Sequence, residues 1–256
     1  MSLQACADIV RQGDPDRFRA AMAAPVEARR ALFPLYAFNV EVARAPWVTQ
    51  EPMIAEMRLQ WWRDALDEIG SGGAVRRHEV TTPLTEVLRG AAIDPETLDA
   101  AVAARRWDIY REPFEDEAHF LDYLDKTGGG LMWASARALG AKAEDEAPVR
   151  GVGVAMALAN WFRAIPALEA LGRIPLADGR PEAIRRLARD VGLARLKAAR
   201  GTGFGPATAA LRAAWMAGPV LEIAARHPDQ VAAGTLDPSD ARKSLSLAWK
   251  ALTNGW

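Results

Sequence analysis

Apolar side chains recur along most of this chain at intervals of three and four residues, which is the period of an amphipathic helix. In residues 58–70, for example, Leu59, Trp62, Leu66 and Ile69 follow this spacing, and Gly70 marks the expected end. Alternating runs of β-branched residues, which predict strands, are almost absent. The pattern therefore predicts an all-α protein.

Capping residues and prolines divide the chain into helices with short connections. Asp14-Pro15 and Asp116, for instance, each precede a helical pattern. No Gly/Ser/Pro-rich linker interrupts the chain, so we expect residues 1–256 to form a single domain of about ten or eleven helices. In the first half of the chain, the expected segments are Pro15 to Met22, Pro25 to Ala43 and Pro52 to Gly70, and two further helices are expected to start at Thr82 and Asp94. In the second half, they are Asp116 to Gly140, Asp145 to Leu171, Pro181 to Ala199, Pro206 to Arg226 and Pro238 to Leu252.

Composition excludes several classes of protein. The 32 Lys and Arg against 33 Asp and Glu give a net charge of −1, which offers no field for nucleic acid. The single cysteine, Cys6, excludes a disulfide framework and fits a reducing compartment. The first residues do not read as a signal peptide, and the longest apolar run, Gly151–Phe162, is shorter than the roughly 20 residues that span a bilayer. We therefore expect a cytoplasmic protein without a transmembrane segment, with peripheral contact to the inner membrane left open.

Isolated motifs offer little chemistry. The three histidines lie far apart in sequence, so a zinc site is not expected. The acidic pairs on helical segments, such as Asp122 and Asp125, read as solvated helix faces. Gly128-Gly129-Gly130 lies inside a helical pattern, where each glycine costs about 1 kcal/mol relative to alanine. This run predicts a kink, or a helix face that another segment approaches closely.

Four runs in order are more specific. They are Leu35-Tyr36-Ala37-Phe38, Trp62-Arg63, Asn160 with Arg163, and Gly172-Arg173-Ile174-Pro175-Leu176. In order and spacing they resemble the squalene/phytoene synthase family. The resemblance implies an isoprenoid-synthase-like helical bundle around a central cavity. Its candidate pocket or ligand-binding residues are Tyr36, Phe38, Asn39, Glu41, Arg58, Trp62, Gly129, Asn160 and Arg163.

The two aspartate motifs of that family are missing. Family members that condense two prenyl diphosphates use these motifs to hold Mg²⁺, which prefers carboxylate and phosphate oxygens. The first motif falls on residues 43–47, where Ala43, Arg44 and Trp47 stand, and the second on residues 164–168, where Ala164 and Leu168 stand. We therefore predict no catalytic residues, no metal site and no cofactor. Pro46 and Pro166 should also bend or end their helices.

One branch of the family shows a similar loss. The chain resembles the branch of the mitochondrial complex I assembly factor in its Ala37–Glu41, Met57–Trp62 and Arg163–Pro166 runs. The resemblance implies a non-catalytic protein that binds a protein client, such as a complex I subunit or assembly intermediate. An isoprenoid or lipid in the cavity is an additional possibility.

Two alternatives stay open. The first is a prenyl transferase with rearranged metal ligands, in which Mg²⁺ would be required. The second is an isoprenoid- or lipid-binding module without chemistry, with tryptophans lining its cavity; packing of these tryptophans in the core is the simpler interpretation. In the first alternative, the metal ligands would be Glu41, Asp64, Asp108 or Asp125, and the diphosphate would be held by Arg58, Arg63 and Arg163. In the second, the tryptophans would be Trp61, Trp62, Trp133 and Trp161.

Overall fold

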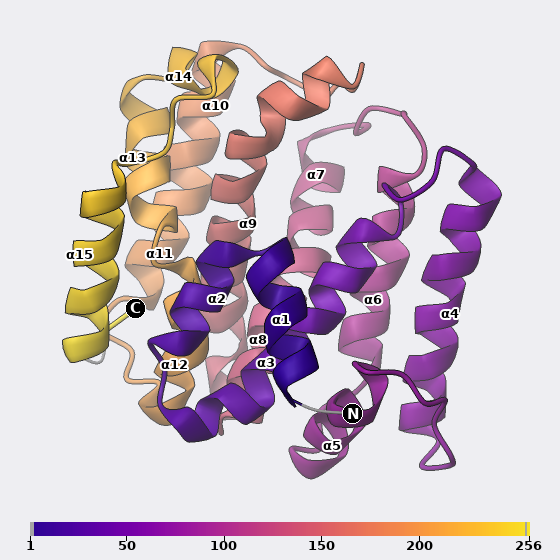
Figure 1. The fold of residues 1–256 in the computed structure, drawn as a ribbon. Coiled ribbons are helices and arrows are strands. Elements are labelled where there is room, and N and C mark those ends of the chain that lie inside the picture. The colour runs from indigo at the N-terminus through magenta and orange to yellow at the C-terminus, as the bar shows by residue number, and fades with distance from the viewer. Residues whose placement is uncertain (1–2, 254) are drawn as a thin grey trace.

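The computed structural model describes residues 3–253, 255 and 256, and throughout this part of the chain the regular structure is helical (Figure 1). The all-α prediction is therefore confirmed. The helices are α1 (Leu3–Gly13), α2 (Pro15–Met22), α3 (Val26–Arg44), α4 (Pro52–Gly70), α5 (Thr81–Gly90), α6 (Glu96–Ala104), α7 (Glu117–Leu124), α8 (Gly130–Ala138), α9 (Glu146–Ala170), α10 (Pro181–Arg186), α11 (Ala194–Ala199), α12 (Thr208–Leu211), α13 (Ala217–Arg226), α14 (Asp229–Ala233) and α15 (Asp240–Leu252).

Two π-helical segments make continuous rods out of neighbouring helices. Segment η2 (Asp125–Gly129) joins α7 to α8, and η4 (Leu187–Leu193) joins α10 to α11. The described residues therefore form thirteen rods, close to the predicted ten or eleven. The difference has three sources. Helix α1 and the short helix α14 were not expected, and the segment expected from Pro206 to Arg226 breaks before α13.

Several expected helix starts are confirmed at atomic detail. Asp14 caps α2 by accepting a hydrogen bond from the backbone N–H of Arg17, and Pro15 occupies the first turn. Asp116 caps α7 in the same way through the N–H of His119. These side chains satisfy donors that the first helical turn leaves free.

The two prolines differ in their effect. Pro46 follows the end of α3 at Arg44, as predicted. Pro166 lies inside α9, which continues for one more turn to Ala170. Figure 1 shows the upper end of α9 turning away from the rest of the rod, so the helix bends near this proline but does not end there.

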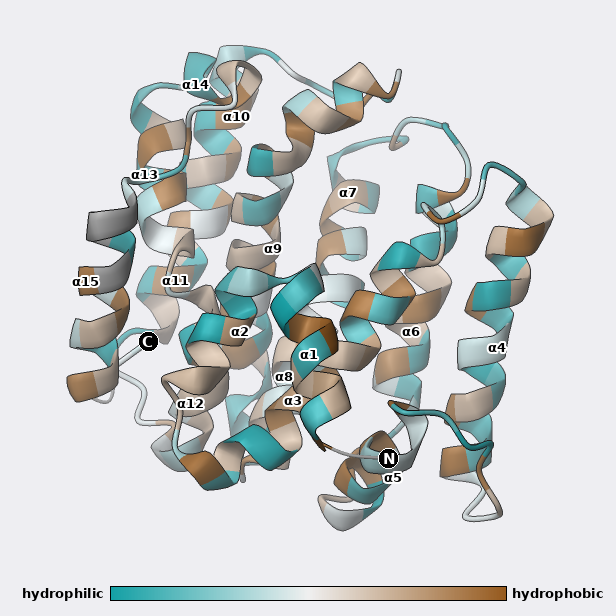
Figure 2. Ribbon diagram, in the orientation of Figure 1, coloured by the Kyte–Doolittle hydropathy of each residue, from teal (hydrophilic) through white to brown (hydrophobic). Residues whose placement is uncertain are grey.

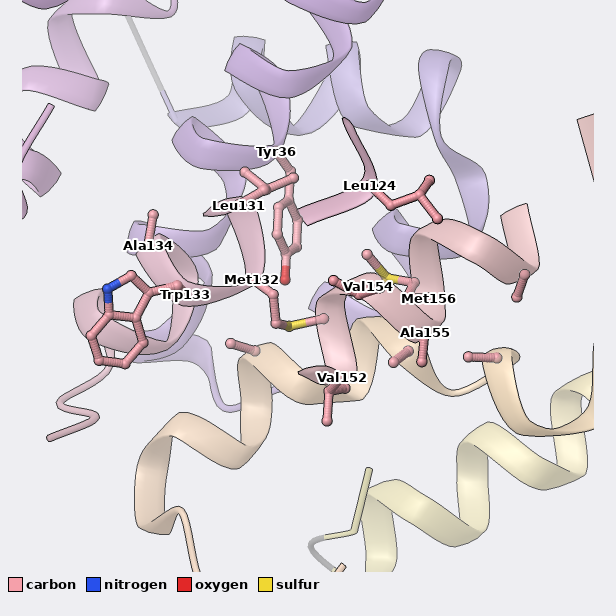
Figure 3. Packing of buried hydrophobic residues seen from close by; sticks show 14 of the residues in the cluster. Tyr36, Leu124, Leu131, Met132, Trp133, Ala134, Val152, Val154, Ala155 and Met156 are labelled. Atoms are coloured by element: carbon pink, nitrogen blue, oxygen red, sulfur yellow. The ribbon is translucent and has the colours of Figure 1, made fainter. Parts of the chain in front are cut away.

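Helix α9 is the centre of the packing. Figure 3 shows Met132, Val152, Val154 and Met156 close together with Tyr36, from α8, α9 and α3. Residues 143–170 are long and apolar enough to cross a membrane by length and composition, but 61% of the most apolar window is buried inside the fold. This supports the prediction of a buried core helix for Gly151–Phe162. Figure 2 shows the remaining helices with mixed apolar and polar surfaces.

The glycine run lets α9 approach η2 closely. A Cβ atom built on Gly153 would lie 2.5 Å from the carbonyl oxygen of Gly128 and 2.8 Å from the Cα of Gly129. A Cβ on Gly128 would lie 2.5 Å from the Cβ of Ala157. Contacts this short exclude any side chain at these positions, so the predicted close approach is confirmed. The π-helical geometry of η2 supplies the local irregularity as well.

Candidate functional site

Two neighbouring cavities lie where the C-terminal end of α3 meets the C-terminal half of α9. The first, called the central cavity here, has a volume of about 380 Å³ and is lined from the first turn of α2, the α3 end, η1 (Arg105–Asp108), α7, η2 and α9. The second, called the side cavity, has a volume of about 650 Å³ and lies toward α13 and Asp237. Both cavities share Arg17, Asn160 and Ala164 in their linings. The resemblance predicted a central cavity, and the structure has one.

Apolar side chains occupy the positions of the missing aspartates. Trp47 and Leu168 line the central cavity, Ala43 lines the side cavity, and Ala164 lines both. Arg44 points to solvent and pairs with Glu41 at 3.6 Å. The end of α3 and the C-terminal part of α9, where the family would hold a metal cluster, thus turn apolar side chains toward the cavities.

Two carboxylates do face the central cavity, and both are already paired. Asp14 accepts hydrogen bonds of 2.9 Å from both the backbone and the guanidinium of Arg17. Asp108, which is 3% exposed, accepts bonds of 3.1 Å from Arg105 and 3.0 Å from the hydroxyl of Tyr123. Burial raises the pKa of Tyr123, which keeps its hydroxyl a donor to Asp108.

Arg163, a predicted ligand-binding residue, is held by acidic partners. Its guanidinium lies 2.8 Å from Asp237 and 3.2 Å from Asp16, and it donates a 3.3 Å bond to the side-chain oxygen of Asn160. Asn160 and Asn39 both line the central cavity, as expected of pocket residues. The side chain of Asn39 has no hydrogen-bonding partner among the described residues.

Three other candidates lie in the core. Tyr36 is 2% exposed, Arg17 stacks over its ring at 5.2 Å, and burial raises the pKa of its hydroxyl to about 12. Phe38 and Trp62 pack edge to face with ring centroids 5.3 Å apart. None of these three residues lines either cavity.

The remaining candidates lie elsewhere. Arg58 is exposed on α4, and Glu41 is half-buried on α3 beside Arg44. Gly129 is buried in η2, where a Cβ would lie 2.4 Å from the carboxylate of Asp125. None of these three lines either cavity.

The tryptophans divide between core and cavity. Trp62 and Trp133 are at most 8% exposed and pack in the core, whereas Trp161 is buried to the same extent and also borders the central cavity. Trp161 belongs to a cluster of aromatic rings with centroids 4.1–5.7 Å apart, in which Trp107 stacks on Phe114. The other members are Phe120 and Tyr123.

The residues present do not fit Mg²⁺. The described side chains include no group of three or more His, Cys, Asp or Glu that could hold a metal ion. The carboxylates suggested as rearranged ligands are dispersed over different elements, and each is paired with arginine. These pairs are Glu41 with Arg44, Asp64 with Arg76, Asp108 with Arg105, and Asp125 with Arg150.

The sequence did not reveal how the segment after α9 is held in place. Arg173, 7% exposed, donates to the carbonyl oxygens of Trp107, Asp108 and Tyr110, and its guanidinium stacks over the rings of Trp47 and Trp107. It thereby ties the segment after α9 to η1 and to the end of α3. The only signal was its place in the Gly172–Leu176 run, because pairing over 60 residues leaves no local pattern.

Comparison with known proteins places the chain among its relatives. The protein-family model for squalene/phytoene synthase matches residues 10–252. The complex I assembly factor 6 homolog of Drosophila melanogaster is 29% identical over 170 residues, and the assembly factor 6 of Bos taurus is 24% identical over 162 residues. These alignments cover 63% of this chain and 50% and 48% of the two relatives. The chain thus spans about half the length of the curated relatives it matches.

Solved structures share the fold. A dehydrosqualene synthase determined in complex with a ligand matches with a TM-score of 0.76 at 16% identity, covering 98% of this chain and 95% of the other. A squalene synthase from Alicyclobacillus acidocaldarius matches with a TM-score of 0.61 at 17% identity, covering 98% and 93%. At this identity the likeness concerns the fold alone, and it confirms the predicted isoprenoid-synthase-like bundle.

Proposed function

Because this chain belongs to the squalene/phytoene synthase family and yet has no carboxylate at the positions of the two aspartate motifs, we propose that it is a non-catalytic assembly factor. Its client would be a protein, specifically a subunit or assembly intermediate of respiratory complex I. It would act in the cytoplasm or at the cytoplasmic face of the inner membrane, as a peripheral protein.

One observation carries the proposal. Ala43, Trp47, Ala164 and Leu168 line the two cavities at the positions where the family carries carboxylates. Departure of a diphosphate requires its negative charge to be neutralised, and metal ions do this in enzymes. Alanine, tryptophan and leucine supply no ligand for such ions. The fold is retained, so selection for something other than this chemistry is the natural explanation.

The names of the curated relatives suggest which function replaced catalysis. Two relatives from distant animals are both named as complex I assembly factors. Since the chain matches only about half of each, the role of the whole relatives is an argument by similarity for this chain. An assembly role needs a binding surface and no chemistry, which agrees with the loss of the metal ligands.

A gene deletion in the source organism tests the assembly role. We expect the deletion to deplete mature complex I on native gels and to leave assembly intermediates, with recovery when the wild-type gene is returned. A tagged copy should enrich complex I subunits after cross-linking, compared with a tagged unrelated helical protein. Normal complex I levels and activity in the deletion strain would refute the proposal.

An enzyme assay tests the absence of catalysis separately. The purified protein, incubated with farnesyl or geranylgeranyl diphosphate and Mg²⁺, should give no condensation product. A family member that retains both aspartate motifs serves as the positive control under the same conditions. Turnover comparable to that control would support the alternative of a prenyl transferase with rearranged ligands.

A further inference from the structure

We propose that the outer face of α15 docks on an anionic lipid surface, with its apolar side chains inserted among the lipid head groups and the neighbouring cations on the phosphates. This inference rests on the peripheral membrane location proposed above, and it names the surface that makes the contact. It depends neither on complex I as the client nor on a ligand in either cavity.

Helix α15 turns an apolar stripe toward solvent. The residues of this stripe recur at the i, i+3, i+4, i+7 spacing of one helix face. They are Leu245, Ala248, Trp249 and Leu252, and the three large side chains among them are exposed to 73%, 69% and 84%. Lys243 and Lys250 are half-buried on the inner side, where Leu247 packs against the core. A surface helix of a globular protein usually has the reverse arrangement, with its apolar stripe on the core, so this stripe calls for an external partner.

The size of the stripe favours a lipid surface over a second copy of the chain. If each of the three large side chains buried about 150 Å², the contact would amount to roughly 450 Å², well below the about 800 Å² per partner of a stable protein interface. Binding to lipid has no such threshold, because its strength scales with the apolar area inserted. Tryptophan, here Trp249, is also enriched at membrane–water interfaces.

Cations lie beside the C-terminal end of α15. Lys197 on α11 and Arg200 directly after it are exposed, and neither forms an ion pair with a described residue. Burial and then the positive charges of Arg200 and Arg212 lower the pKa of Lys250, so these like charges lie close together. Residues 240–256 add three basic residues against one acidic residue, although the whole chain has a net charge of −1. This local excess of positive charge complements lipid phosphates.

The N-terminal end of α4 is the competing surface. It exposes Met53, Ile54 and Met57, and α4 lies at the opposite edge of the bundle from α15 (Figure 2). The guanidinium of Arg106 beside it is already paired with Glu56 at 2.8 Å. We therefore assign lipid contact to α15 and use the α4 end as the control.

Vesicle flotation tests the lipid class. We would mix the purified chain with vesicles of phosphatidylcholine alone and with vesicles that also contain roughly 30% phosphatidylglycerol. The chain should bind the anionic vesicles about tenfold more tightly, and added salt should weaken this binding. Equal binding to both kinds of vesicle, or binding to neither, would overturn the inference.

Variants locate the contact. Trp249→Ser removes a large apolar side chain from the stripe and should lower the affinity for anionic vesicles about tenfold. Lys197→Gln and Arg200→Gln should each lower it about fivefold. Met57→Ser is the matched control and should bind like wild type. All four side chains are exposed, so thermal unfolding midpoints should stay at the wild-type value. Loss of binding in Met57→Ser but not in Trp249→Ser would move the contact to α4 and refute the assignment.

These results are separable from those of the complex I experiments. Vesicle binding that depends on Trp249, in a chain whose deletion leaves complex I intact, would support the docking surface while the assembly role fails. Depleted complex I without vesicle binding would do the opposite. A dimer in solution that Trp249→Ser splits, again without vesicle binding, would assign the stripe to a second copy and overturn the inference.

Discussion

The close contact between α9 and η2 makes a sharp prediction about two glycines in the same helix. In Gly153→Ala, the new Cβ would lie 2.5 Å from the carbonyl oxygen of Gly128 and 2.8 Å from the Cα of Gly129. Both neighbours are backbone atoms, so no side chain can move aside. In Gly151→Ala, two residues earlier, the Cβ would lie 3.7 Å from Arg195, which is ordinary van der Waals contact.

The two substitutions share one effect and differ in another. Each replaces glycine by alanine inside α9, which favours the helix by about 1 kcal/mol. Only Gly153→Ala forces atoms together, and overpacking of this kind costs about 1–3 kcal/mol. Because the helix propensity cancels between the variants, we expect Gly151→Ala to be more stable than Gly153→Ala by about that amount. For a domain of this size the difference corresponds to roughly 2–12 °C in unfolding midpoint.

Chemical denaturation of the two variants beside wild type measures this difference. The slopes of the denaturation curves should agree, so that the midpoints report stability alone. We expect Gly151→Ala at or above the wild-type stability and Gly153→Ala below it. Equal stability of the two variants, within about 0.5 kcal/mol, would refute the argument that steric exclusion by η2 requires glycine at position 153.

Three further substitutions probe burial and charge. Asp108→Asn leaves the guanidinium of Arg105 without its buried partner and should destabilise the fold by about 3–5 kcal/mol, measured by thermal unfolding, whereas a wild-type midpoint would contradict the pairing. Burial raises the pKa of the Cys6 thiol from 9.0 to about 11, so the unfolded chain loses this proton first and stability should fall by about 2–3 kcal/mol as the pH rises through 9–11. Cys6→Ala should show a smaller fall over that window, and an identical pH dependence would count against the assignment. Arg186→Ala breaks an exposed pair with Glu117, and its midpoint should stay within the error of wild type; a clear loss would mean that the pair matters more than its exposure indicates.

Much of the fold was predictable because its signals are local. Periodicity and caps predicted the helices that begin near Asp14 and Asp116. The glycine run predicted that another segment packs closely against it, but the sequence did not show that this segment is α9. Two expectations were wrong in detail. The segment from Pro206 to Arg226 is two helices, with Pro219 in the first turn of α13, and the chain after it forms α14, which ends at Gly234 in a left-handed conformation.

Motif runs marked more candidate residues than the cavities use. Asn39, Asn160 and Arg163 line the cavities, whereas Arg58 and Glu41, which also belong to such runs, do not. A motif gives a residue's place along a helix, but which face of that helix meets the cavity depends on how the helices pack.

Helix period and motif composition are properties of neighbouring residues, so the order of residues is enough to show an all-α member of the family without carboxylates at the two motif positions. Which groups face the cavities depends instead on how the helices pack. Asp14 and Asp108 pair with arginines only three positions away, but they reach the same cavity from separate segments. Arg163 meets Asp237 and Asp16 across 74 and 147 positions. Electrostatic balance in a cavity is set by distance in space, and the chain order does not carry that information.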